Sequence, residues 1–160
     1  MTEIDFYLLA QQQTQNANST LDPRMEFAIR LCHKVHKLGH QVFICTESQQ
    51  HSEKLGKALW CLTPESFLAN QIIDSQSPDV RVLPNTIHIS HNICKDSAPP
   101  LGNDILINLS LEIPGIFSRF NRHIEIVSDE EKIKEKIRGH WMFFQQRGYT
   151  LRKHDLRKPA

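Results

Sequence analysis

Two cations and an aromatic side chain recur at helical spacing near the end of the sequence. Lys134 and Arg138 are four residues apart, and Trp141 follows three residues later, so on a helix the three side chains project side by side. Val127 ends an apolar run just before them. An apolar floor, two cations and an aromatic wall suit a ligand with a carboxylate and an apolar side chain, such as the C-terminus of a peptide. The plainer explanation of the same spacing is a solvated basic face over a core stripe.

These residues need a strand and a helix to bring them together. Residues 122–127 have the composition of a buried strand, and Ser128 with Glu131 three residues later predicts a capping box at the start of a helix. Gly148 predicts the end of that helix. The buried stripe of the helix is expected at Ile133, Ile137, Trp141 and Phe144.

Strands and helices alternate along the rest of the chain. Apolar runs predict strands at residues 4–9, 41–45, 80–83, 87–90 and 104–109. Apolar residues at helical spacing predict helices at residues 23–38 and 48–60, and a short helix at 114–120. This alternation indicates the α/β class, with three layers and a mostly parallel sheet. We expect a single domain over residues 1–150, followed by a basic C-terminal tail at residues 151–160.

The composition is that of an ordinary soluble globular protein. The 160 residues suffice for one domain, 39% of them are hydrophobic, and the net charge of +1 argues against coating nucleic acid by bulk charge. The charge is uneven, because nine Lys or Arg and two acidic residues lie between residues 132 and 158. No apolar run has the length of a membrane span, and the first residues do not resemble a signal peptide. The four cysteines show no close pairing, so we expect free thiols in a reducing cytoplasm.

Patterns that would carry a reaction or a metal are weak. His88, His91 and Cys94 are spaced three apart, and residues 32–36 hold another Cys and two His, but neither cluster has the second ligand pair that structural zinc requires. The G-x-S-x-G motif of a nucleophile elbow does not occur. The polar loop at residues 11–20 lacks the glycines with which a backbone cradles phosphate. We therefore expect no catalytic, cofactor-binding or metal-binding residues.

Trp60 and Phe67 stand at the ends of predicted elements. Trp60 ends a helix, and Phe67 follows a Thr-Pro-Glu turn. Large aromatic side chains at such corners are favoured anchors of protein interfaces. Ordinary core packing explains the same positions equally well.

Several blocks of the sequence resemble one family. They are FYLL at residues 6–9, ALW-x-x-x-PESF at 58–67, DILINL at 104–109, and the K-x-x-x-R-x-x-W and R-G-Y pieces of the last helix. Together they resemble the chi subunit of bacterial DNA polymerase III holoenzyme, over nearly the whole chain. The resemblance implies a Rossmann-like fold without a nucleotide and a non-enzymatic accessory protein of the clamp loader. It also implies two partners, the psi subunit and the acidic C-terminal tail of single-stranded DNA-binding protein.

The resemblance also assigns residues to these partners. The tail site of the family matches Val127, Lys134 and Arg138, with Trp141 at a position that is usually tyrosine. Trp60 and Phe67 match the psi surface, where a helicase can compete with psi. The expected location is the replisome, associated with the nucleoid in the cytoplasm, with DNA contacted only indirectly.

Two other functions remain open from the sequence. Direct binding of single-stranded nucleic acid by the basic C-terminal helix is opposed by the net charge of +1 and by few surface aromatics for base stacking. A nucleotide-dependent enzyme on the same fold is opposed by the glycine-free loop at residues 11–20.

Overall fold

The structure is a computed structural model that describes residues 2–9, 22–61, 70–72, 87–91 and 104–156. The described part contains a seven-stranded sheet in the order β3-β4-β2-β5-β6-β1-β7, and all its paired strands are parallel. The strands are β1 (Glu3–Leu8), β2 (Val42–Cys45), β3 (Asn70–Ile72), β4 (Ile87–Ser90), β5 (Ile105–Asn108), β6 (Arg122–Val127) and β7 (Thr150–Asp155). The predicted α/β class with a mostly parallel sheet is confirmed.

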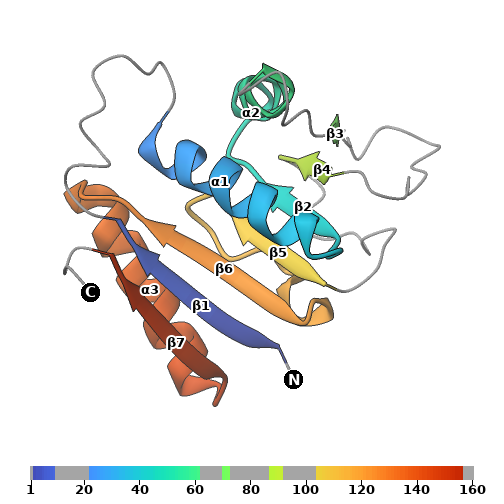
Figure 1. Cartoon of the computed structure of the whole chain (residues 1–160). Helices are drawn as coiled ribbons and strands as arrows, with labels where there is room; N and C mark the ends of the chain where they lie inside the picture. Colours follow the sequence, from blue (N-terminus) through green and yellow to red (C-terminus); the bar gives the residue numbers. More distant parts are fainter. Residues whose placement is uncertain (1, 10–21, 62–69, 73–86, 92–103, 157–160) are drawn as a thin grey trace.

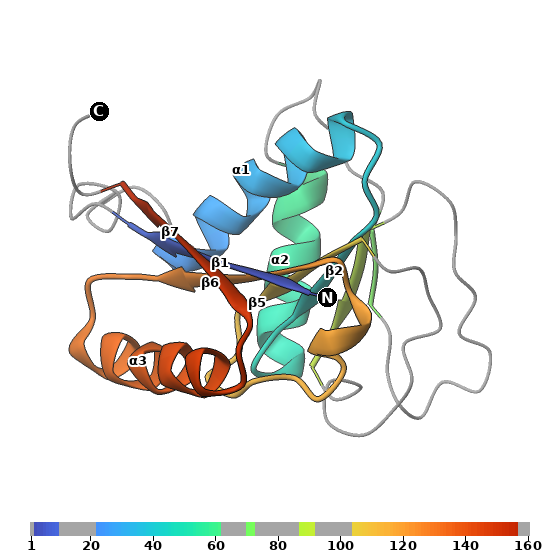
Figure 2. The ribbon, with the colours of Figure 1, turned by 90° about the horizontal axis from the view of Figure 1, so that it is seen from below.

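Three helices complete the layers. Helices α1 (Pro23–Lys37) and α2 (Gln49–Cys61) cover one face of the sheet, and α3 (Glu131–Gln146) covers the other face beneath β6, β1 and β7 (Figures 1 and 2). Each face has its own core. The α1 side buries Ala28, Ile29, Cys32, Leu55, Leu59, Ile44 and Ile107, and the α3 side buries Phe6, Phe117, Ile133, Ile137 and Phe144.

The first strand lies between the last two strands of the chain. β1 pairs with β6, where Leu8 is opposite Val127, and with β7, where Phe6 is opposite Lys153. Residues opposite one another in register point to the same face of a sheet. Side chains of β1, β6 and β7 therefore meet on the face that α3 covers.

The start of α1 follows the pattern expected from its sequence. Asp22 accepts a hydrogen bond from the backbone N–H of Arg24 at 2.8 Å, and Pro23 occupies the first helical position. The buried guanidinium of Arg24 donates to the carbonyl oxygens of Ile126 at 2.8 Å and Leu109 at 3.3 Å. These bonds fix α1 to the carboxyl ends of β5 and β6.

The start of α3 differs from the prediction. The N-cap is Glu130, without a side-chain hydrogen bond, so the predicted capping box of Ser128 and Glu131 is wrong. Ser128 is buried at the end of β6, two residues before the cap, and its hydroxyl has no hydrogen-bond partner. The other end is as expected, because Gly148 has a φ of +78°, which suits glycine after a helix.

The structure also differs from the predicted bounds of a short helix and of the C-terminal tail. The short helix expected at residues 114–120 is a single 3-10 turn at Phe117–Arg119. The strand expected at residues 80–83 lies outside the described residues. The stretch from 150 to 155 is strand β7, so the segment predicted as a basic tail begins inside the sheet.

The cysteines differ from one another. Cys32 is a free, buried thiol, and burial raises its pKa to about 12, so it stays protonated. Cys45 is disulfide-bonded, so the expectation of four free thiols is wrong at this position.

Within the described residues, none of the helices combines the length and apolar character of a membrane-spanning segment.

Candidate functional site

A cavity of about 300 Å³ opens between α3 and the carboxyl ends of β1 and β6. All four residues predicted for a tail site, Val127, Lys134, Arg138 and Trp141, line it. The remaining lining residues are Phe6, Leu8, Leu9, Ser128, Asp129, Ile137 and Lys153. The structure therefore brings the predicted residues together around one site, which we call the α3 pocket.

The floor and one wall of the α3 pocket are apolar. Val127 and Phe6 are buried, and the half-buried indole of Trp141 packs on the Phe6 ring with the ring centres 4.9 Å apart. This contact fixes the orientation of Trp141, so its free side forms a rigid wall. An apolar side chain of a ligand would find a prepared surface here.

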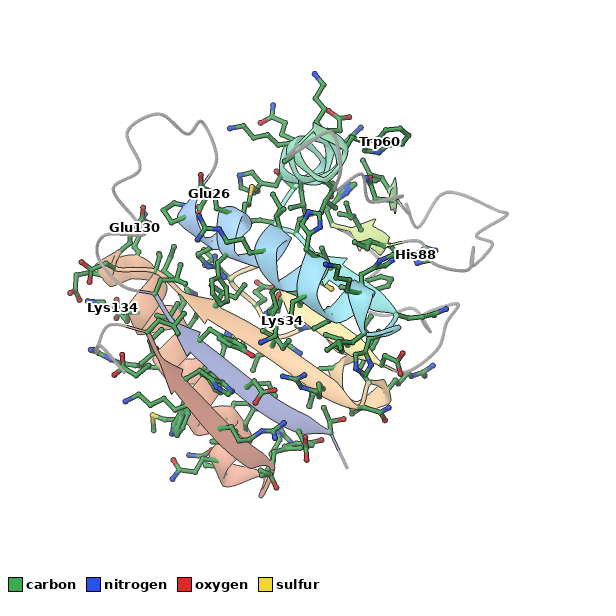
Figure 3. The ribbon with its side chains drawn as sticks, in the orientation of Figure 1. Glu26, Lys34, Trp60, His88, Glu130 and Lys134 are labelled. Carbon is green, nitrogen blue, oxygen red and sulfur yellow. The ribbon has the colours of Figure 1, made fainter. Side chains whose placement is uncertain are left out.

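The cations on α3 differ in their surroundings. Lys134 lies in the first turn of α3 (Figure 3), and its Nζ is 2.8 Å from Asp129 Oδ1 and 3.8 Å from Glu131 Oε1. Arg138 is exposed and has no ion pair among the described residues. Of the two α3 cations that line the pocket, Lys134 is therefore already paired with acidic side chains, whereas the charge of Arg138 is available to an anionic ligand.

A buried polar cluster holds α3 on the sheet. Glu125 of β6 is fully buried, and its Oε1 accepts hydrogen bonds from Asn108 at 3.0 Å, His123 at 2.9 Å and His140 of α3 at 3.1 Å. Burial alone would raise the pKa of Glu125, but the hydrogen bonds and charges of His123 and His140 lower it to about 2. The carboxylate is therefore ionised at neutral pH.

His140 of α3 lies between two polar groups from other elements. Its Nδ1 is 3.1 Å from Glu125 Oε1, and its Nε2 is 3.1 Å from the carbonyl oxygen of Leu111. These contacts connect β6, α3 and the segment after β5, and they position the helix that carries the α3 pocket.

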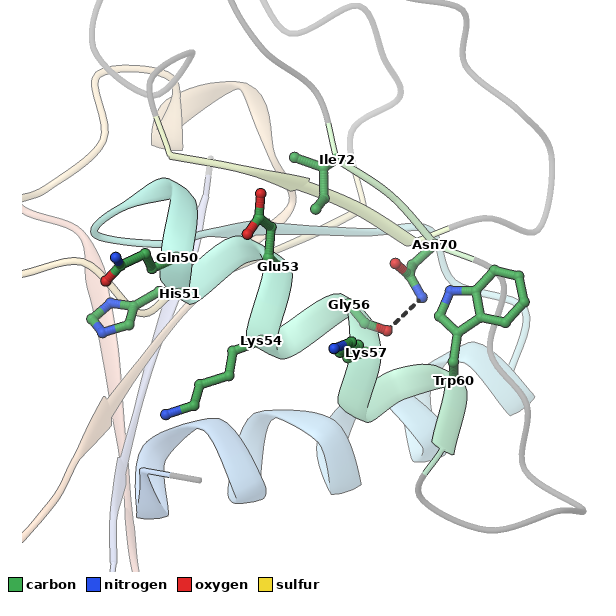
Figure 4. Close-up of a pocket in the computed structure, with 9 residues that line it drawn as sticks. All are labelled: Gln50, His51, Glu53, Lys54, Gly56, Lys57, Trp60, Asn70 and Ile72. Carbon is green, nitrogen blue, oxygen red and sulfur yellow. Dashed lines mark hydrogen bonds between the residues drawn. The ribbon is translucent and has the colours of Figure 1, made fainter. Parts of the chain in front are cut away.

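A second hollow, which we call the α2 groove, lies between α2 and the edge strand β3 (Figure 4). Its volume is about 970 Å³, and Trp60 and Ile72 in its wall are 50% and 38% exposed. Asn70 donates to the carbonyl of Gly56 at 3.2 Å, and a Cβ added to Gly56 would lie 2.9 Å from Asn70 Oδ1, so glycine allows the close approach of β3 to α2.

Trp60 lies beside the α2 groove. Its side chain is half exposed, so it is not packed in the core, and its role as an interface anchor stays a prediction. Phe67, the other predicted anchor, lies outside the described residues.

Comparison with known proteins gives the family of the chain. A family model described as DNA polymerase III chi subunit, HolC, matches residues 1–152. The chain belongs to this family. It is 31% identical to the DNA polymerase III subunit chi of Pseudomonas aeruginosa, over 98% of both chains. It is 26% identical to the subunit of the same name from Haemophilus influenzae, over 91% of this chain and 92% of that one.

The family assignment makes the chain a replication accessory subunit whose relatives are named as polymerase subunits. No group of three or more His, Cys, Asp or Glu that could hold a metal occurs among the described residues. Cys94 of the cluster considered from the sequence is outside them.

The sequence did not indicate several residues of the α3 pocket. Phe6 and Leu8 of β1 were expected only as buried strand residues, Ser128 as a helix cap, and Lys153 as part of a tail. One signal was available, since Leu151 alternates with charged neighbours as in a strand. The pairing of that strand with β1 depends on the tertiary fold.

Proposed function

We propose that this protein is a non-catalytic subunit that links the clamp-loader assembly of DNA polymerase III to single-stranded DNA-binding protein during DNA replication. In this proposal the acidic C-terminal tail of that protein binds in the α3 pocket. The psi subunit binds on the other side of the molecule and attaches the chain to the clamp loader. The protein would act in the cytoplasm at the replisome, without a cofactor, and would contact DNA only through its partners.

The observation that supports this proposal is the composition of the α3 pocket. Lys134 and Arg138 stand beside an apolar floor at Val127 and an aromatic wall at Trp141. A peptide C-terminus offers the complementary groups, namely a carboxylate, acidic neighbours and an apolar side chain. A site of about 300 Å³ holds only a few residues of a peptide, so we expect micromolar affinity that decreases as salt rises.

The psi proposal depends on the α2 groove. Trp60 offers an exposed aromatic ring at the rim of an open hollow, with Ile72 as a second apolar contact. We propose that psi uses Trp60 together with Phe67, and that a helicase can compete for the same surface. Trp60→Ala should abolish measurable psi binding, while Leu38→Ala, which removes another exposed apolar side chain that does not line the groove, should leave it unchanged.

The tail proposal is tested by titration of a labelled peptide that copies the C-terminal end of the organism's single-stranded DNA-binding protein. Fluorescence anisotropy should show saturable, salt-sensitive binding, and Lys134→Glu and Arg138→Glu should each abolish it. Lys132→Glu is the matched control, because Lys132 is on the same helix, is exposed and does not line the pocket. Unchanged binding by Arg138→Glu would show that the peptide binds elsewhere.

Direct binding of single-stranded nucleic acid is the second candidate, and the uncompensated charge of Arg138 favours it. A gel shift with bare single-stranded DNA at physiological salt separates the two functions. Tight binding of the oligonucleotide, lost in Arg138→Glu, would support the nucleic-acid function. Absence of a shift, together with peptide binding, would support the adaptor function.

A further inference from the structure

The charges around the α3 pocket are not equally available to a ligand. Asp129 and Lys134 form a close ion pair at the mouth of the pocket, at 2.8 Å, so their charges largely cancel. The cations that attract an anion most strongly must therefore be those without an internal partner.

Lys153 is such a cation, and it comes from a different element. In the register of β7 with β1 it is opposite Phe6, so its side chain points to the face that α3 covers and lines the pocket. It is exposed and has no ion pair among the residues that the structure describes. It also lies just beyond residues 1–152, the stretch that the family model matches.

Ser128 supplies an unsatisfied hydrogen bond in the same pocket. The residue is 3% exposed, it lines the pocket, and its buried hydroxyl has no partner. A buried hydroxyl without a partner is unfavourable, and a ligand oxygen that accepts its hydrogen would remove that cost. The hydroxyl lies at the end of β6, one residue after the apolar floor at Val127.

We propose that a carboxylate ligand of the α3 pocket is held by Arg138 of α3 and Lys153 of β7, with the Ser128 hydroxyl as hydrogen-bond donor. Lys134 stays paired with Asp129 and does not bind the ligand directly, so Lys134→Glu abolishes binding because it leaves two unpaired carboxylates beside the pocket. The proposal rests on the function proposed above and adds to it the residues that determine specificity. Lys153 and Ser128 make the pocket selective for a ligand with a free carboxylate next to an apolar side chain.

The test uses a fluorescein-labelled acidic peptide that ends in phenylalanine, made once with a free C-terminal carboxylate and once as the C-terminal amide. With the free carboxylate, Lys153→Gln and Ser128→Ala should each raise Kd by about three- to tenfold. With the amide, the effect of Ser128→Ala should fall to less than about twofold, because the hydroxyl has lost its charged acceptor.

A pair deletion tests the role of Lys134. The double variant Asp129→Asn with Lys134→Gln removes two opposite charges that largely cancel, so it should raise Kd less than Lys153→Gln does. Lys132→Gln is the single-charge control outside the pocket, and its Kd should stay within about twofold of the unchanged protein. If the pair deletion weakens binding more than Lys153→Gln does, Lys134 is the direct ligand and the proposal is wrong.

The controls distinguish this proposal from the one on which it rests. Lys153 is exposed on an edge strand, so Lys153→Gln should unfold at the same temperature as the unchanged protein. If Arg138→Glu abolishes binding but Lys153→Gln and Ser128→Ala bind normally, the tail site stands and the assignment of Lys153 and Ser128 is overturned. If the unchanged protein binds neither peptide in low salt, the proposed tail function fails, and this assignment fails with it.

Discussion

Replacement of Glu125 by glutamine isolates the charge of the buried cluster beneath α3. The substitution keeps the shape of the side chain and an acceptor for Asn108, His123 and His140, but it removes the negative charge of the buried carboxylate. A carboxyl that titrates at about 2 instead of 4.5 contributes about 3 kcal/mol to stability at neutral pH, at about 1.4 kcal/mol for each pKa unit.

The sign of the pH dependence follows from the lowered pKa. The contribution of Glu125 is complete above the unfolded value of 4.5 and is lost as the pH falls toward about 2, where the folded protein also binds the proton. The unchanged protein should therefore lose stability over this window, whereas Glu125→Gln should lose less. The difference in unfolding free energy between the two should shrink from about 3 kcal/mol at pH 7 toward zero near pH 2.

Urea unfolding followed by circular dichroism at a series of pH values measures this difference. Glu135→Gln is the matched control, because Glu135 is an exposed carboxylate on the same helix, and its effect should stay within about 0.5 kcal/mol. A difference for Glu125→Gln that is equal at pH 7 and pH 3 would refute the argument from charge. A variant as stable as the unchanged protein at pH 7 would show that the buried carboxylate does not hold α3.

Three further predictions concern α3 and the two hollows. Gly139→Ala should stabilise the protein by up to about 1 kcal/mol, measured by thermal unfolding, because Gly139 is exposed in mid-helix and an added Cβ meets nothing within 4 Å; destabilisation would contradict this. Asp129→Asn should tighten binding of an acidic peptide by about two- to fivefold, because it removes a negative charge from the pocket and releases Lys134 from its ion pair. Weaker binding would show that Asp129 organises the site. Trp60→Ala should change the unfolding free energy by less than about 1 kcal/mol, because the ring is half exposed, and a larger loss would mean that Trp60 is a core residue after all.

The sequence was informative where hydrophobic spacing alone decides the structure. Ile133, Ile137 and Phe144 are buried as the stripe of α3 predicted, and Trp141 lies at the border of the stripe, where it becomes a wall of the pocket. The four predicted pocket residues come together because three of them lie on one face of a single helix. Such a face needs only local spacing to be recognised.

Features that depend on pairing between distant segments were not predictable. His140 is polar, yet it is buried, because Glu125 and Leu111 provide its partners from other elements. The charged sequence of β7 suggested a solvated tail, but Arg152 donates to the buried carboxylate of Asp5 on β1 at 2.9 Å. The burial of His140 and the contact of the exposed Arg152 with Asp5 both depend on partners that lie far away in the sequence.

The place of β1 in the sheet has a consequence for how the protein is made. The bond between Arg152 and Asp5 spans 147 residues, and β1 gains both of its neighbours, β6 and β7, only from the last part of the chain. During synthesis, β2 and β5 can pair earlier, while β1 waits with two open edges until residues 122–155 are available. Such non-local pairing slows folding and exposes strand edges to aggregation. A chain that stops before β7 would keep one of these edges open permanently and would also lack Lys153 in the α3 pocket. Shortening this protein from its C-terminal side should therefore lower its solubility and weaken the pocket together.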